Sequence, residues 1–261
     1  MSALLGSRRL MRIAMLVVAL AAGDLVRAAS VLDVGRFQLP AGAAVPVPAP
    51  WQLIRFDQQI APTQFQLRHW DGVAALEVTA KASMALLARP LTVDLEQTPM
   101  LCWRWRIDAP LLTADMSSKA GDDYAARLYL AFSLPSAELS LAARAKLALA
   151  RSVYGEQVPD AALNYVWDNR YPIGTLRANA YTERAQMWVL RSGAAAAGGW
   201  VNERRDVLAD SQRAFPGASL HIRMLAVTAD TDNTGEQAHA GFAEVHFVSR
   251  ATPCAFAPPP R

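Results

Sequence analysis

The stretch Leu101-Cys102-Trp103-Arg104-Trp105-Arg106-Ile107 decides the fold. Apolar and basic side chains alternate along it, and successive side chains of a β-strand point to opposite faces of a sheet. One face therefore carries both tryptophans with leucine and isoleucine, whereas the other carries both arginines. This pattern predicts a strand with one buried face and one polar face.

Similar short segments, rich in β-branched and aromatic residues, recur along the chain between turn residues. The pair Asp71-Gly72 separates two of them and predicts a hairpin. The spacing favours an all-β fold, a single β-sandwich of jelly-roll type that is similar in kind to galactose-binding-like modules. The expected strands are residues 51–56, 64–70, 73–80, 84–88, 101–108, 123–134, 176–181, 186–191, 219–229 and 242–249.

Two segments depart from the strand pattern. Residues 137–152 are rich in Ala and Leu and predict one inserted helix, with Ser136 as its N-cap and Glu138 in the first turn. Residues 207–215 predict a shorter helix that ends at Pro216-Gly217.

The N-terminus is typical of a cleavable secretory signal peptide over residues 1–28. Three arginines precede an uncharged apolar run at 13–22, and Val26-Arg27-Ala28 places small residues around a cut after Ala28. The apolar run is too short to span a bilayer, so we expect a periplasmic protein without a membrane span in its mature chain. The alternative is an uncleaved N-terminal anchor.

Removal of this segment changes the charge balance. The chain has 26 basic and 23 acidic residues, and the segment takes four basic and one acidic, which leaves 22 of each. A neutral mature chain does not favour nucleic acid as a partner. We expect a Pro/Ala-rich lead-in at 29–50, the sandwich domain at 51–250 and a flexible tail at 251–261.

The two cysteines, Cys102 and Cys254, allow a single disulfide in an oxidising compartment or two unrelated thiols, and the sequence leaves both open. The standard catalytic motifs GxSxG, HExxH and GxGxxG and the phosphate-binding P-loop motif are absent. Sequence motifs therefore assign no catalytic residue.

A ligand-binding surface is predicted from the polar faces of two strands. Arg104 and Arg106 share one face, and Asp123, Arg127 and Tyr129 share another. If the two strands are neighbours in one sheet, the excess of arginine predicts recognition of an anionic group, such as a carboxylate on a glycan. A solvated polar face is the alternative.

A third segment, residues 200–206, adds Glu203 and Arg205 to the predicted site. The favoured function is non-catalytic binding of a glycan or another anionic ligand. Carboxylates on facing elements, Asp123 with Glu203 or Asp206, would instead permit a glycoside hydrolase or lyase. A structural envelope protein without a small ligand is the third alternative.

Residues 229–235 read Ala-Asp-Thr-Asp-Asn-Thr-Gly. Carboxylate and amide oxygens at Asp230, Asp232 and Asn233 are suitable ligands for Ca²⁺, but the same residues form tight turns. The sequence therefore predicts either a Ca²⁺ site or a plain turn at this position. It indicates no other cofactor.

Several blocks together resemble a bacterial secreted family, domain of unknown function 3047. They are residues 102–106, Lys119 with 121–129, 165–167, 192–193, 203–207 and 230–235. The resemblance covers about residues 51–247 and implies export, one domain and no assigned chemistry. Ala229 stands where the resemblance would expect threonine, which removes one potential oxygen ligand.

We predict that the exported protein begins at Ala29, because the cut after Ala28 satisfies the small-residue pattern. N-terminal sequencing of protein from a periplasmic fraction measures the new terminus. A cytoplasmic protein that begins at Met1 or Ser2 would contradict the prediction.

Overall fold

The computed structural model describes residues 31–40 and 42–257, and the predicted signal peptide at 1–28 lies outside them. Sheet A contains β1 (Leu32–Gly35), β2 (Ala44–Val45), β4 (Gln64–Trp70), β5 (Val73–Lys81), β7 (Met100–Ile107), β12 (Val201–Asp206) and β14 (Gln237–Val248). Sheet B contains β3 (Gln52–Ile54), β6 (Leu86–Pro90), β8 (Tyr124–Ser133), β9 (Ala161–Asp168), β10 (Leu176–Ala178), β11 (Ala185–Ser192) and β13 (His221–Asp230).

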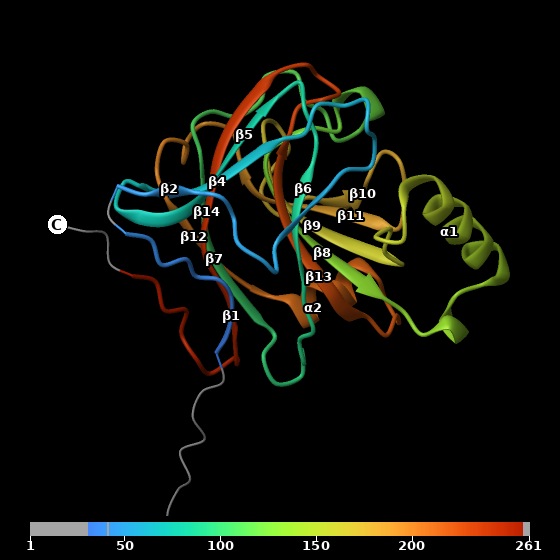
Figure 1. Ribbon diagram of the computed structural model, residues 1–261. Helices are drawn as coiled ribbons and strands as arrows, with labels where there is room; N and C mark the ends of the chain where they lie inside the picture. The colour runs from blue at the N-terminus through green and yellow to red at the C-terminus, as the bar shows by residue number, and fades with distance from the viewer. Residues whose placement is uncertain (1–30, 41, 258–261) are drawn as a thin grey trace, which may run out of the picture.

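The two seven-stranded sheets pack face to face, which confirms the predicted all-β sandwich (Figure 1). Sheet A has the order β12-β7-β14-β5-β4-β2, and β1 pairs with β14. Sheet B has the order β10-β11-β9-β8-β13-β6-β3. Most pairs are antiparallel, but β9 and β11 run parallel.

The alternation in β7 is confirmed. Trp103 and Trp105 are fully buried between the sheets and contact aromatic residues of β9 in the opposite sheet. The ring centroid of Trp103 lies 5.5 Å from that of Tyr165, and the centroid of Trp105 lies 5.6 Å from that of Trp167. These contacts join β7, the neighbour of edge strand β12 in sheet A, to β9 in the interior of sheet B.

The predicted Asp71-Gly72 hairpin is also confirmed, because β4 and β5 pair antiparallel up to Trp70 and Val73. Asp71 and Gly72 have φ angles of +47° and +75°. Left-handed backbone at both central positions is the requirement of a type I′ turn, and Asp followed by Gly accepts it at low cost.

One expectation about neighbours is wrong. β7 belongs to sheet A and β8 to sheet B, so the two strands that were to share a polar face lie in opposite layers. Residues 109–122 carry the chain from one sheet to the other. The outer face of β7 and the outer face of β8 therefore point away from each other.

Several strands were not predicted. β9 is buried at all eight positions, and the apolar residues Ala162 and Val166 on its outer face interrupt the alternation of apolar and polar residues. The lead-in at 29–50 also differs from a linker in its described part, because β1 pairs with β14 and β2 pairs with β4. Backbone pairing orders these short segments despite their proline content.

The inserted helix is present as α1 (Leu141–Tyr154), and the shorter helix is α2 (Val207–Ala214). Ser140 caps α1 by accepting from the Ala143 amide, whereas the expected cap, Ser136, begins a 3₁₀ turn, η2 (Ser136–Glu138). A second 3₁₀ turn, η1 (Lys119–Gly121), precedes β8. No helix in the described part of the chain combines the length and hydropathy needed to cross a bilayer.

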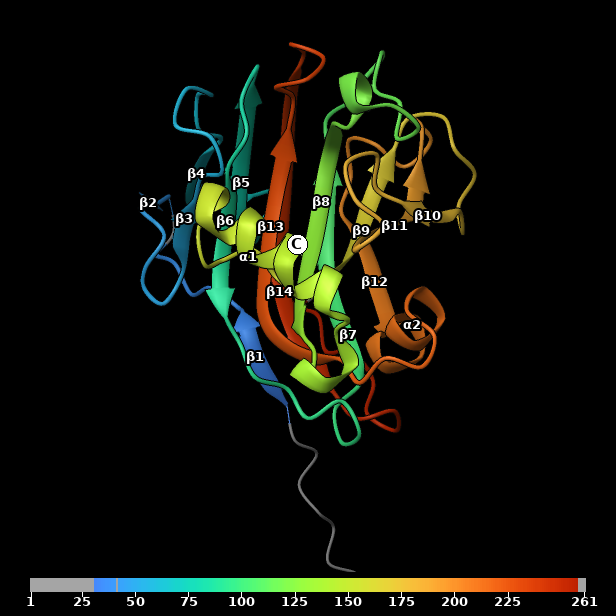
Figure 2. The same ribbon diagram turned by 90° about the vertical axis from the view of Figure 1, so that its right-hand side faces the viewer.

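α1 lies over the outer face of sheet B, where it crosses in front of β6, β13 and β8 (Figures 1 and 2). Leu147 is its only buried residue. The helix therefore covers the sheet without burying a full apolar face against it.

The C-terminal segment is fixed to sheet A in its described part. Cys254 forms a disulfide with Cys102 of β7, which resolves the choice that the sequence left open. The amide of Ala257 donates to Glu244, 2.6 Å away. Residues 251–257 therefore differ from the flexible tail that was expected.

We expect Trp105→Ala to lower the free energy of unfolding by about 3–5 kcal/mol, because it empties a fully buried site between the sheets. Denaturant unfolding measures the change. Leu112→Ala is the matched control, since Leu112 is 81% exposed and its truncation should stay within about 0.5 kcal/mol. An unchanged stability in Trp105→Ala would contradict the face assignment.

Candidate functional site

The structure separates the predicted ligand-binding residues into three groups. Arg104 and Arg106 lie on the outer face of sheet A, and Arg127 and Tyr129 lie on the outer face of sheet B. Asp123 precedes β8, and Glu203 and Arg205 lie on edge strand β12. A single arginine-lined surface does not form, because its two central strands belong to different sheets.

The sheet A arginines are neutralised within the protein. Arg104 pairs with Glu244 at 2.9 Å and lies over the ring of Phe256, 5.0 Å from its centroid. Arg106 pairs with Asp71 and lies over Trp70, 4.1 Å from its ring centroid. This face therefore offers no excess positive charge to an anion.

The β12 residues complete buried networks. Glu203 accepts from the indole of Trp105 at 3.0 Å and from Arg191 at 2.6 Å. Arg205 donates to Asp210 at 2.6 and 2.8 Å. Because the protein itself supplies these partners, Glu203 and Arg205 stabilise the edge of the sandwich.

The remaining carboxylates proposed for catalysis do not pair as the hydrolase alternative required. Asp206 accepts from the Ala209 amide at 3.0 Å and so caps α2. Asp123 lies beside β8 of sheet B, whereas Glu203 hydrogen-bonds to the buried indole of Trp105 in sheet A. The predicted acid–base pairs are therefore not supported by their positions.

Four aspartates surround one arginine at the N-terminal end of β8, and we call them the carboxyl cluster: Asp122, Asp123, Asp230 and Asp232 with Arg127. Arg127 pairs with Asp230 at 2.8 Å. Its Nε donates to Asn164 of β9 at 2.9 Å. Carboxyl groups outnumber the arginine, whereas the sequence predicted an excess of arginine here.

Two tyrosines flank the arginine of the carboxyl cluster. The guanidinium lies 5.7 Å from the ring centroids of both Tyr124 and Tyr129. Strict alternation would place Tyr124 on the face opposite Arg127 and Tyr129, but its hydroxyl donates to Asp122 at 3.1 Å on their side of the sheet. A register shift in the β8–β13 pairing next to this residue explains the departure from strict alternation.

Asp122 and Asp123 have different partners. Asp122 accepts from the amide of Asn179 at 2.7 and 2.9 Å. Asp123 accepts from the backbone and side chains of Asn233 and Thr234 at 2.7–3.3 Å. Asp123 therefore holds the turn at 230–235 against sheet B.

The pKa values of three cluster carboxyls are displaced upward. Burial is the largest cause for Asp122, Asp230 and Asp232, and the neighbouring aspartates add to it. The pKa of Asp230 lies well above its ordinary value although Arg127 opposes the shift. Oδ1 of Asp230 and Oδ1 of Asp232 are buried without a hydrogen-bond partner in the described structure.

In the turn at 230–235, the Asn233 side chain has protein partners at both its nitrogen and its oxygen. The amide of Asn233 donates to Asp123 at 3.0 Å, and its Oδ1 accepts from Tyr181 at 3.0 Å. Within the described residues, the only three metal-ligating side chains that converge are Cys102, His246 and Cys254. The geometry favours the alternative reading, an Asx-rich turn.

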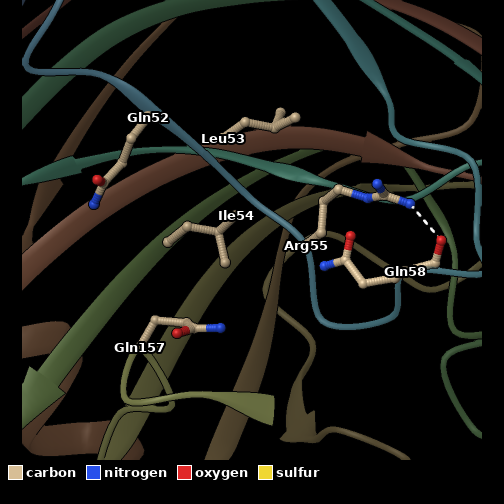
Figure 3. Close-up of a pocket in the computed structure, with 6 residues that line it drawn as sticks. All are labelled: Gln52, Leu53, Ile54, Arg55, Gln58 and Gln157. Atoms are coloured by element: carbon tan, nitrogen blue, oxygen red, sulfur yellow. Dashed lines mark hydrogen bonds between the residues drawn. The ribbon is translucent and has the colours of Figure 1, made fainter.

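Two cavities lie beside α1. One of about 470 Å³ is bounded by α1 and the residues between β8 and β9 that flank it. The other, of about 370 Å³, lies at β3, and Figure 3 shows three glutamine side chains around it. Its lining is Gln52, Leu53, Ile54, Arg55, Gln58 and Gln157. Arg55 is held by the carbonyl of Gln58 at 2.8 Å.

The sequence matches the family described as Protein of unknown function (DUF3047) over residues 49–246. The chain belongs to this family. The match confirms the resemblance to domain of unknown function 3047. No curated protein matches the chain.

Two solved structures are similar to this family member at low identity. One is the Trichoderma harzianum endoglucanase 3 from family GH12, with 7% identity, a TM-score of 0.37, and coverage of 78% of this chain and 99% of that one. The other is the endo-1,4-beta-glucanase CelB2, with 10% identity, a TM-score of 0.40, and coverage of 79% and 99%.

The sequence located part of the carboxyl cluster and missed the rest. Asp123, Arg127, Asp230 and Asp232 were selected, but for different sites. Three contributing residues were not selected from the sequence. Asp122 lies in the loop before β8, Asn164 lies in the unpredicted strand β9, and Asn179 directly follows β10. The adjacent acids Asp122-Asp123 were the one local signal, and only the sheet B register brings the other residues to them.

We expect Asp122→Asn to change the pH dependence of stability. The raised pKa means that the folded chain keeps a proton which the unfolded chain releases above about pH 4. Because of this carboxyl, the free energy of unfolding of the native chain decreases as the pH rises, by at most about 1.4 kcal/mol per pH unit.

The free energy of unfolding of Asp122→Asn, relative to the native chain, should therefore increase as the pH rises above about pH 4. Urea unfolding at a series of pH values measures this slope. Asp57→Asn, at an exposed loop residue, is the control and should leave the slope unchanged. A flat difference for Asp122→Asn would contradict the assignment of the raised pKa.

Proposed function

We propose that the outer face of sheet B binds a neutral glycan at the carboxyl cluster. The observation that carries the proposal is a pair of free donors beside carboxyl groups. The hydroxyl of Tyr129 and Nη2 of Arg127 make no hydrogen bond in the described structure. Neither atom is among those that are both fully buried and without a hydrogen-bond partner. Both atoms therefore keep some contact with solvent, although Arg127 and Tyr129 are only 9% and 7% exposed as whole residues.

The charge of the site supports a neutral ligand. Arg127 is already paired with Asp230, and three further aspartates surround the pair. An anionic sugar would meet this excess of acid, which disfavours the anionic ligand expected from the sequence. A sugar hydroxyl both donates and accepts, so it can bind Arg127, Tyr129 and a carboxyl in either protonation state.

The cavity at β3 supports extension of the ligand along the same sheet. Its three glutamine amides each offer donors and an acceptor to hydroxyl groups. Leu53 and Ile54 add apolar surface that suits the ring face of a sugar. Polar groups with fixed directions beside apolar surface are usual in small-molecule sites.

Glycoside hydrolysis is a second candidate, favoured by one observation. Asp232 is half-buried and its pKa is raised, so a ligand can reach a carboxyl that holds its proton at a higher pH than usual. A general acid requires this property. Release of reducing ends that is lost in Asp232→Asn would support hydrolysis over binding alone.

The test of binding is calorimetric titration of the protein with cellohexaose, xylohexaose and laminarihexaose, with a galacturonate hexasaccharide as the anionic comparison. We expect at least one neutral hexasaccharide to bind more tightly than the anionic one. Tyr129→Phe removes a single donor and should weaken that binding about 2- to 10-fold, as expected for one hydrogen bond.

Thr79→Val is the control, because it removes a single hydroxyl from an exposed residue of β5 in sheet A, the opposite layer of the sandwich. Its affinity should equal that of the native protein. The proposal fails if none of the three neutral sugars binds, or if Tyr129→Phe binds them as tightly as the native chain does.

A further inference from the structure

A second site lies on the outer face of sheet A, the layer opposite the proposed glycan site. Cys102, His246 and Cys254 each offer one ligand atom, and these three atoms all lie within 4.8 Å of one another. We propose that, when the disulfide is reduced, these residues bind a thiophilic metal ion of the Cu(I) or Zn²⁺ class. This proposal does not depend on the function of sheet B.

Two of the ligands are fixed by sheet register. Cys102 of β7 and His246 of β14 are directly opposite each other on neighbouring antiparallel strands. Both are fully buried, and side chains at such paired positions lie on the same face. Ligands held on paired strands keep their separation whether or not the third ligand is bonded to one of them.

The third ligand, Cys254, is held near the sheet by contacts other than the disulfide. Arg36 donates to the carbonyl of Ala255 at 2.9 Å, and Arg104 donates to the carbonyl of Ala257 at 2.6 Å. Both contacts lie on the C-terminal side of Cys254, and on its N-terminal side Arg204 donates to the carbonyl of Thr252 at 3.5 Å. The segment therefore stays against β7 and β14 after the bridge opens. Cys254 is half-buried, which lets a small reductant reach its sulfur.

The imidazole of His246 is arranged as a metal ligand. Its Nδ1 lies 2.6 Å from the carbonyl oxygen of Glu244, which only accepts, so Nδ1 carries the hydrogen. Nε2 is buried and has no hydrogen-bond partner in the described structure. A histidine whose other nitrogen donates to a backbone carbonyl is the usual form of a metal-ligating imidazole.

A bulge in β14 produces this arrangement. The pairing with β7 shifts between Ala243 and His246, and Glu244 has a φ of +55° in the left-handed region. A non-glycine residue is uncommon there, and bulges turn side chains toward particular sites. The bulge presents the Glu244 carbonyl to His246 while Val245 and Phe247 still face the core.

The donor set decides the class of metal. Two thiolates and one imidazole are soft or borderline ligands, which favour Cu(I) and Zn²⁺ over Ca²⁺ or Mg²⁺. Met100, Val248 and Phe256 form the apolar surroundings of the two cysteines. A largely dry pocket of this kind strengthens bonds between a cation and thiolate sulfur.

The redox step requires a dithiol reductant. The dithiol supplies two electrons and two protons, the bond between the two Sγ atoms breaks, and the reductant closes to its own disulfide. Cys102 and Cys254 become thiols. Metal binding then releases both thiol protons to solvent as the two thiolates bond to the ion.

The test compares the full chain before and after anaerobic treatment with dithiothreitol, followed by removal of the reductant. Cu(I) and Zn²⁺ are each added, and bound metal is measured after desalting. We expect one ion per reduced chain and none per oxidised chain. Addition of Co²⁺ to the reduced chain should give a thiolate-to-cobalt absorption band, which reports sulfur ligation directly.

His246→Gln should weaken metal binding at least tenfold, whereas His221→Gln, at an exposed histidine of sheet B, should bind as the native chain does. Near-ultraviolet circular dichroism of the tryptophan core follows the fold during reduction. Three results would overturn the site: no uptake of either metal by the reduced chain, equal affinity in His246→Gln, or loss of the folded spectrum on reduction.

Discussion

The contact between the aromatic rings of β7 and β9 is the constraint on which the rest of the structure depends. Trp103 and Trp105 project from sheet A onto Tyr165 and Trp167 of sheet B. Large rings bury much apolar surface, and their tilted and stacked geometry restricts how the two sheets slide. Once these faces are joined, every polar residue between them on β7 and β9 must point outward or find a buried partner.

This constraint explains why several arginines are paired with carboxylates. On β7 the outward positions place Arg104 and Arg106 against carboxylates and aromatic rings of sheet A. At the sandwich edge, Arg205 meets Asp210, which also accepts from the hydroxyl of Tyr165. A buried charge is tolerated only when it is paired and hydrogen-bonded, and these pairs meet that condition.

The carboxyl cluster is the exception to this balance. Its aspartates outnumber Arg127, and the unpartnered oxygens of Asp230 and Asp232 would cost stability in a site with a purely structural role. Displaced pKa values in such a setting mark functional sites more often than average positions. The two outer faces of the sandwich therefore differ: on sheet A the arginines of β7 are paired with carboxylates, and in the described part of the chain sheet B retains donors without partners beside carboxyl groups whose pKa values are raised.

The sequence by itself determined the strand alternation, the Asp71-Gly72 hairpin, the all-β class and the two helices, because each depends on neighbouring residues and a local period. It also selected Arg127 as a candidate ligand-binding residue and Asp230 as a candidate Ca²⁺ ligand. The tertiary structure alone decided that β7 and β8 lie in opposite sheets, that Cys102 meets Cys254, and that Asp122 joins Asp230. Strand order and sheet membership depend on the packing of whole faces between residues far apart in the chain. No local pattern encodes that choice, so a surface inferred from two strands depends on which sheet each strand joins.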